Sequence, residues 1–148
     1  VGAVILTNSE SGPALRGPFA RRILELMFDG RPQAEADVAA AAKSYFNDIA
    51  ATRKLLTVPA DPTEAGKLAG TYASGPLGGL TVTHPGGATV FDFGEWKTDM
   101  ATRKEPDGST TLVSITPGID GLEFVPGSGA KRTLTIRDAQ HEYVFTER

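Results

Sequence analysis

The feature that most constrains the fold is the regular succession of short alternating segments after Gly70. Apolar and polar residues alternate within each segment, as in a strand that has one face against a core. Turn residues separate the segments, which predict about eight strands: Thr71–Ala73, Leu80–His84, Thr89–Phe93, Trp96–Thr102, Thr111–Thr116, Leu122–Val125, Arg132–Arg137 and Glu142–Thr146. Short strands with hairpin-length breaks predict an antiparallel meander that closes into a barrel.

Two phenylalanines in the middle of this pattern predict the inward face. Phe91 and Phe93 alternate with Val90 and Asp92, so they lie on one side of a strand. The same alternation predicts the core and lining residues: Leu80, Val82, Phe91, Phe93, Val113, Ile115, Leu122, Phe124, Leu134, Ile136, Tyr143 and Phe145. Small barrels are filled by side chains or hold one small ligand. For a ligand, the expected binding residues are the aromatic lining: Phe91, Phe93, Phe124 and Tyr143.

The first part of the chain has a different pattern. Gly2–Thr7 is a continuous apolar run, which is typical of a strand buried on both faces. A helix is predicted from Pro18, and its apolar residues recur at helical spacing: Phe19, Ile23, Leu26 and Met27. Gly30 is expected to adopt the left-handed conformation that ends this helix ahead of Pro32.

A second helix is predicted from about Gln33 to Thr57. One stripe along it is expected to pack against the first helix or the barrel: Val38, Ala42, Tyr45, Ile49, Thr52 and Leu56. Val58–Pro62 has the composition of a linker. Asp61 is expected to cap a short helix that begins at Pro62, with Glu64 at the third helical position.

The composition excludes several classes of function. The formal charge of the 148-residue chain is −3, so no basic surface for nucleic acid is predicted. The chain has no cysteine, which excludes disulfides, thiolate ligands and a cysteine nucleophile. No apolar run approaches the roughly 20 residues of a membrane-spanning helix, so no membrane span is predicted.

Two regions resemble the serine β-lactamase and penicillin-binding-protein family. Gly2-Ala-Val-Ile-Leu-Thr-Asn8, followed by a helix that ends at Phe28-Asp-Gly30, resembles the last strand and last helix of that fold. Three later motifs resemble the lipocalin-like C-terminal domain of β-lactamase-related serine hydrolases of D-aminopeptidase and esterase type: Leu68-Ala-Gly-Thr-Tyr72, Thr89-Val-Phe-Asp-Phe-Gly-Glu-Trp96 and Pro117-Gly-Ile-Asp-Gly-Leu-Glu-Phe124.

The resemblance implies three parts: a remnant of the catalytic domain in residues 1–30, a helical linker in residues 31–66, and a lipocalin-like barrel in residues 67–148. It also implies a catalytic domain upstream of Val1, with Ser-x-x-Lys, Tyr-x-Asn and Lys/His-x-Gly boxes. The chain lacks an initiator methionine and is expected to be an excised fragment without that active site. A periplasmic or secreted parent, which needs no cofactor, is expected.

Short sequences that match all three boxes occur in this chain, but their predicted structural contexts do not fit catalysis. Ser128 and Lys131 match Ser-x-x-Lys in a predicted turn between strands, whereas the nucleophile must begin a buried helix. Tyr45 and Asn47 lie two residues apart on a helix, so they do not share a face. His84 ends a strand. We therefore expect these residues to be structural and predict no catalytic residue.

No metal site is predicted either. His84 and His141 are the only histidines, and a transition-metal site would need further ligands such as Asp92, Glu95 or Asp120. Asp92 and Glu95 flank a glycine and are expected to face opposite ways, as hydrogen-bonded rim residues. A functional acid–base pair would instead be buried, with one raised pKa.

These features favour a non-catalytic accessory domain of a serine hydrolase that shapes the active-site cleft, selects substrate or mediates oligomerisation. The expected interface pieces are Gln33–Thr57, Pro117–Gly121 and Pro126–Ala130. A homo-oligomer through Gly2–Thr7 or the helical segment is a further expectation. The alternative is a small-molecule-binding barrel, which a cavity above about 300 Å³ would favour. Independent hydrolysis is a third hypothesis, carried by Ser128.

Overall fold

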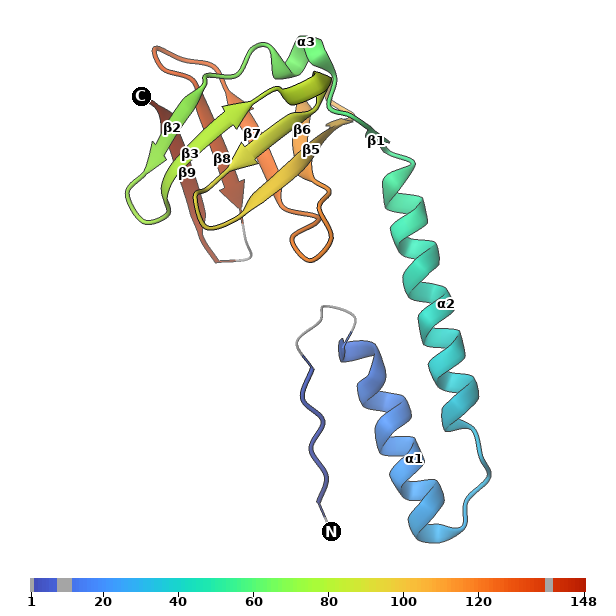
Figure 1. The fold of residues 1–148 in the computed structure, drawn as a ribbon. Coiled ribbons are helices and arrows are strands. Elements are labelled where there is room, and N and C mark those ends of the chain that lie inside the picture. The colour runs from blue at the N-terminus through green and yellow to red at the C-terminus, as the bar shows by residue number, and fades with distance from the viewer. Residues whose placement is uncertain (1, 8–11, 138–139) are drawn as a thin grey trace. The chain divides into compact units, whose positions relative to one another are not determined.

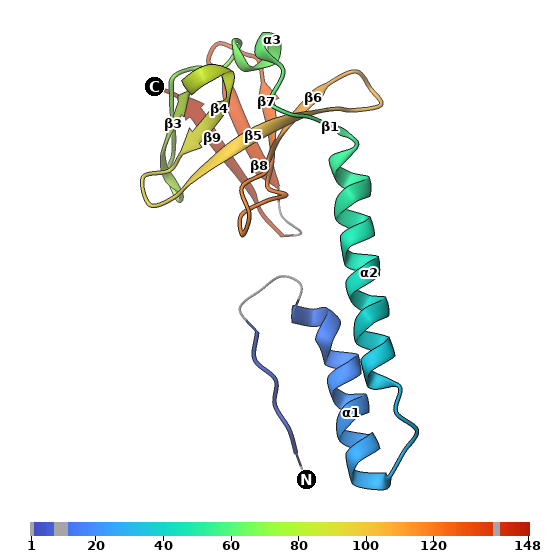
Figure 2. The ribbon, with the colours of Figure 1, turned by 45° about the vertical axis from the view of Figure 1, so that its right-hand side comes forward.

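The computed structural model describes residues 2–7, 12–137 and 140–148. The chain divides into two compact units, Val1–Arg53 and Lys54–Arg148. The first is helical, and the second is a β-barrel (Figures 1 and 2). The predicted fold class, a mainly β chain with helices ahead of an antiparallel barrel, is confirmed. The boundary between the units falls inside the region predicted as a helical linker.

The first unit contains a 3-10 turn and two helices: η1 (Gly12–Leu15), α1 (Arg16–Phe28) and α2 (Ala34–Arg53). Asp29 ends α1 with a left-handed backbone, at a φ of +50°, and its N–H donates to the carbonyl of Glu25. The prediction that Gly30 holds this conformation is wrong. Aspartate tolerates it because its short polar side chain can bond locally. Residues 2–7 have no regular secondary structure, so the strand predicted there pairs with no described strand.

The barrel unit begins with a strand that the sequence pattern placed in a helix. β1 (Leu56–Thr57) pairs antiparallel with β5 (Lys97–Lys104). The prediction that the second helix continues to Thr57 is wrong, because α2 ends at Arg53. β4 pairs with β5 only from Lys97 to Met100, which leaves the rest of that edge for β1. A strand partner distant in sequence therefore overrides the helical pattern.

Seven further strands join β5 to close the barrel: β2 (Thr71–Ser74), β3 (Gly78–Thr83), β4 (Thr89–Asp92), β6 (Thr110–Ser114), β7 (Glu123–Gly127), β8 (Thr133–Arg137) and β9 (Glu142–Glu147). Each strand pairs antiparallel with the next along the chain, and β9 returns to pair with β2. Figure 2 shows this closure with the strands tilted around the barrel. The predicted meander is therefore confirmed.

Large side chains fill the barrel interior. Eight of them have at most 1% of their surface exposed: Tyr72, Leu80, Phe91, Met100, Leu112, Phe124, Leu134 and Phe145. The core prediction for β6 is confirmed in part. Val113 is 3% exposed and so buried as predicted, but its neighbour Leu112, which was not predicted, is 1% exposed and belongs to the central cluster of buried apolar side chains. In the ladder with β7, Leu112 pairs with Phe124 and Val113 pairs with Glu123. Ile115 is only half-buried. Leu112 and Val113 are both apolar, so alternation gave no way to choose between them.

Two other core predictions differ from the structure. Leu122 lies outside β7 and is 37% exposed, and Tyr143 is half-buried. β7 instead continues through Pro126, which was predicted to begin a turn. Proline has no N–H to donate to a ladder. β6 pairs with β7 only at Glu123 and Phe124, so the β6–β7 ladder needs no N–H from Pro126.

A short helix, α3 (Pro62–Ala65), lies over one end of the barrel (Figure 1). Asp61 caps it as predicted, because its carboxylate accepts the N–H groups of Thr63 and Glu64. We call this end, with the β3–β4, β5–β6 and β7–β8 connections, the α3 end. The opposite end, with the β2–β3, β4–β5 and β6–β7 connections, is called the Trp96 end.

Candidate functional sites at the two barrel ends

A cavity of about 370 Å³ opens at the Trp96 end. Three connections and three strands line it with these described residues: Leu77, Gly78, Gly79, Phe93, Glu95, Trp96, Leu122, Ile136 and Phe145. Its volume lies in the range of small-ligand sites. The cavity sits at the mouth, above the filled interior.

The β4–β5 turn positions the aromatic wall of this cavity. Gly94 takes a φ of +88°, and the N–H of Phe93 donates to the carbonyl of Trp96 at 3.0 Å. These features close a two-residue hairpin turn, for which a glycine with positive φ is favourable. The rings of Phe93 and Trp96 consequently stack, with centroids 4.0 Å apart and planes at 19°.

Phe93 connects this wall to the core. Its ring centroid lies 6.0 Å from that of Phe124 and 5.8 Å from that of Phe145. Of the four aromatic residues predicted to bind a ligand, Phe93 lines the cavity, whereas Phe91 and Phe124 are fully buried in the packed interior. Tyr143 instead packs against the ring of His141. The alternation of apolar and polar residues therefore predicted which side chains are apolar and inward, but not which of them line the open end of the barrel.

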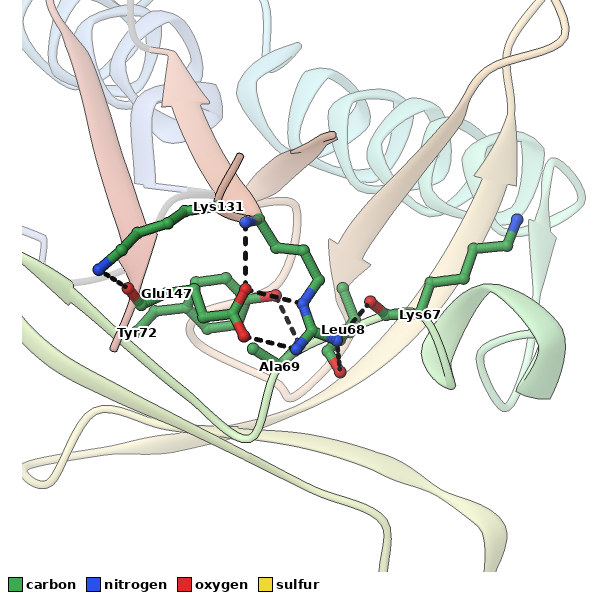
Figure 3. A network of polar contacts seen from close by, with 7 residues as sticks. Lys67, Leu68, Ala69, Tyr72, Lys131 and Glu147 are labelled. Carbon is green, nitrogen blue, oxygen red and sulfur yellow. Dashed lines mark hydrogen bonds and ion pairs between the residues drawn. The ribbon is translucent and has the colours of Figure 1, made fainter. Parts of the chain in front are cut away.

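The α3 end holds a network of polar contacts centred on Arg132 and Glu147 (Figure 3). Arg132 Nε lies 2.9 Å from Glu147 Oε2, and Nη2 lies 2.5 Å from Oε1. Arg132 Nη1 also donates to the carbonyls of Lys67 and Leu68 at 3.2 and 3.1 Å. Nearby, the buried Tyr72 hydroxyl accepts the N–H of Ala69 at 2.8 Å. The network links the segment after α3 to strands β2 and β9.

The electrostatics of this network fit a structural role, and we call the Arg132–Glu147 pair with its hydrogen bonds the clasp. The Arg132 side chain, aided by the Arg132 N–H, lowers the pKa of Glu147 to about 2. Burial raises the pKa of Tyr72. A cavity of about 320 Å³ adjoins the clasp, and its other charged lining residues, Glu64 and Lys67, form an ion pair at 2.8 Å. Its charges are thus already paired within the chain.

The residues of the catalytic-box strings occupy ordinary structural positions. Ser128 is exposed directly after β7, and Lys131 Nζ donates to the carbonyl of Glu147 at 3.3 Å. Tyr45 lies in α2, with its ring against Phe46. His84 Nδ1 lies 3.2 Å from Thr89 Oγ1 at the end of β3.

The two carboxylates of the β4–β5 turn have separate environments. Asp92 accepts the N–H of Gly94 and forms an ion pair with Lys97, each at 2.8 Å. The Lys97 hydrogen bond, followed by that of Gly94, lowers the pKa of Asp92, which is the reverse of what an acid catalyst needs. Glu95 instead lines the Trp96-end cavity. Within the described ranges, no group of three histidine or carboxylate side chains is placed to hold a metal.

Comparison of the chain with known protein families, curated proteins and solved structures finds no match. In the part of the chain that the structure describes, no helix has the length and apolar character to cross a bilayer. Function is therefore inferred from the fold, its side chains and the resemblance in the sequence.

Proposed function

We propose that this chain is a non-catalytic accessory region of a β-lactamase-related serine hydrolase. The barrel is a self-contained module beside the catalytic cleft, and the helical unit docks on an upstream catalytic domain of the same protein. On the same resemblance, the parent protein acts in the periplasm or outside the cell. The observation that carries the proposal is the exposed apolar side of α1.

The described part of the helical unit buries little apolar surface. In α1, Phe28 is 70% exposed, Leu24 is 52% exposed and Met27 is 48% exposed. Met27 and Phe28 follow Leu24 by three and four residues, so the three side chains lie on one helix face, which we call the α1 apolar face. Burying a side chain of this kind stabilises a fold by about 1.5–3 kcal/mol. A face of three such residues indicates that α1 is completed by a further surface.

The barrel supports the other half of the proposal. Its interior is filled, its α3 end is held by the Arg132–Glu147 pair, and Ser128 lies exposed directly after β7. A nucleophile needs a base within hydrogen-bond reach. Lys131, the base of the Ser-x-x-Lys string, donates instead to a backbone carbonyl. Cleft shaping by the barrel loops requires no chemistry from these residues.

The α1 apolar face gives the decisive test in the parent protein, whose upstream residues should contain a Ser-x-x-Lys box. The double variant Leu24→Glu/Phe28→Glu should lower hydrolysis of nitrocefin or p-nitrophenyl acetate at least tenfold, because it puts two charges into the docking surface. Val144→Glu, at a barrel position that is 41% exposed, is the control and should retain activity. A fully active double variant, or a parent without the Ser-x-x-Lys box, would refute the proposal.

Two measurements on the present chain separate the competing roles. We expect no turnover of p-nitrophenyl esters or nitrocefin. Activity that disappears in Ser128→Ala would establish independent hydrolysis instead. If light scattering finds a dimer that Leu24→Glu/Phe28→Glu converts to monomer, the α1 apolar face mediates self-association. A dimer that instead depends on residues 1–8 would dissociate when they are deleted.

A further inference from the structure

The Trp96-end cavity combines an aromatic wall with one carboxylate. Among the described residues that line it, Glu95 alone carries a charge. Within the described ranges Glu95 forms no ion pair, whereas the neighbouring Asp92 is bound to Lys97. The only tryptophan of the chain, Trp96, stacks on Phe93 beside this carboxylate. An aromatic surface next to an unpaired carboxylate attracts a cation that has an apolar body.

We propose that the Trp96 end of the barrel binds a small organic ammonium compound that carries an apolar ring or chain. Its ammonium group lies against the Glu95 carboxylate and the Trp96 ring, and its apolar body enters the cavity between Leu77, Leu122 and Phe145. This site is independent of the proposed accessory role, since it requires no upstream domain and no hydrolysis. It also differs from the predicted ligand site inside the barrel, which side chains fill.

The shape of the mouth supports a ligand of this size. Leu77 is 44% exposed and Leu122 is 37% exposed, so apolar surface flanks the opening. Gly78 and Gly79 contribute only backbone to the lining, and a Cβ atom at either position would meet no atom within 4 Å. A cavity of about 370 Å³ with such walls holds a molecule with one aromatic ring and a short chain.

A second polar group is a strand neighbour of two residues in the cavity wall. Ser74 is 6% exposed, and its hydroxyl has no hydrogen-bond partner among the described residues. Ser74 lies opposite Gly78, and the β2–β9 register, continued by one residue, puts it beside Phe145. Both of these neighbours line the cavity. Ser74 itself is not among the residues that line the cavity, so the recognition proposed here rests on Glu95 and Trp96.

Trp96 is also the reporter for the test. We would titrate the full chain with phenethylamine, 2-phenylethanol and phenylacetate, which share a ring but differ in charge, and follow fluorescence excited at 295 nm. Phenethylamine should bind most tightly, with a Kd of about 0.1–1 mM for so small a ligand. Phenylacetate should bind weakest, because Glu95 repels it. Equal affinities for the three compounds, or no saturation by phenethylamine below about 20 mM, would overturn the proposal.

Charge variants locate the site. Glu95→Gln should weaken phenethylamine about two- to fivefold, the range for a solvent-exposed ion pair, and should leave 2-phenylethanol unchanged. Asp99→Asn is the matched control, because it removes one negative charge from an exposed position on β5. Leu77→Lys should reverse the preference in favour of phenylacetate. Near-UV circular dichroism of each variant checks the fold. If Glu95→Gln and Asp99→Asn behave alike, Glu95 does not recognise the ligand and the site is refuted.

Discussion

The Glu25 carboxylate of α1 accepts the backbone N–H of Ala34, the first residue of α2, at 2.8 Å. The same oxygen accepts the N–H of Gln33 at 2.6 Å. The first N–H groups of a helix have no partner within the helix, and a negative charge at that end is favourable. Glu25 is 6% exposed, so a residue of one helix caps the next from a buried position.

Removing this cap should loosen the start of α2. In Glu25→Ala, the amides of Gln33 and Ala34 should exchange hydrogen roughly tenfold faster, because both lose their acceptor. Glu35→Ala is the control, since Glu35 is an exposed acidic residue in the first turn of the same helix. Exchange measured by mass spectrometry should separate the two variants. Unchanged protection in Glu25→Ala would show that the contact does not hold the helix.

The clasp at the α3 end predicts an acid-sensitive contribution to stability. The pKa of Glu147 is lowered to about 2, against about 4.3 in an unfolded chain. The ionised carboxylate is therefore favoured by folding. Its contribution is complete above about pH 4.5 and disappears as the pH falls towards 2.

Glu147→Gln should accordingly have a lower Tm than the unaltered chain at pH 7 and nearly the same Tm at pH 2. Calorimetry across this range measures the difference. Glu142→Gln is the control, because its ion pair with Arg137 is largely exposed and should contribute little. A gap that stays constant from pH 7 to pH 2 would mean that ionisation of Glu147 does not stabilise the fold.

Tyr72→Phe tests a buried hydrogen bond in the barrel. The change deletes the hydroxyl that accepts the N–H of Ala69 and leaves that buried N–H without an acceptor. Such a loss costs about 1–3 kcal/mol. Urea unfolding followed by Trp96 fluorescence should show it. Tyr143→Phe, at a half-buried position, should change the free energy of unfolding by less than about 0.5 kcal/mol.

Phe91→Ala tests the filled interior. Phe91 has no exposed surface, and its ring packs edge-on against Phe124 at 5.1 Å. The cavity left by this substitution should cost about 3–5 kcal/mol. Phe46→Ala, at a residue of α2 that is 66% exposed, should cost less than about 0.5 kcal/mol. A loss below about 1 kcal/mol for Phe91→Ala would mean that the barrel interior is loosely packed.

Local sequence determined much of the fold. The alternation of Phe91 with Asp92 predicted a strand, and Gly94 marked the turn between β4 and β5. Asp61 capped α3 because its spacing to Thr63 and Glu64 lies within one turn. Each of these features depends on residues close together in the chain, and so pattern and propensity were enough to predict them.

Only the tertiary structure decided the remaining features. Leu56, predicted in a helix, instead pairs with Arg103 in a strand, and Leu112 rather than Val113 joins the central core cluster. The joining of Glu95 with Leu77 and Phe145 at one mouth, and of Arg132 with Glu147 at the other end, likewise required the closed ring. Alternation assigns side chains to two faces, but which face is inside, and which ends meet, depend on partners distant in sequence.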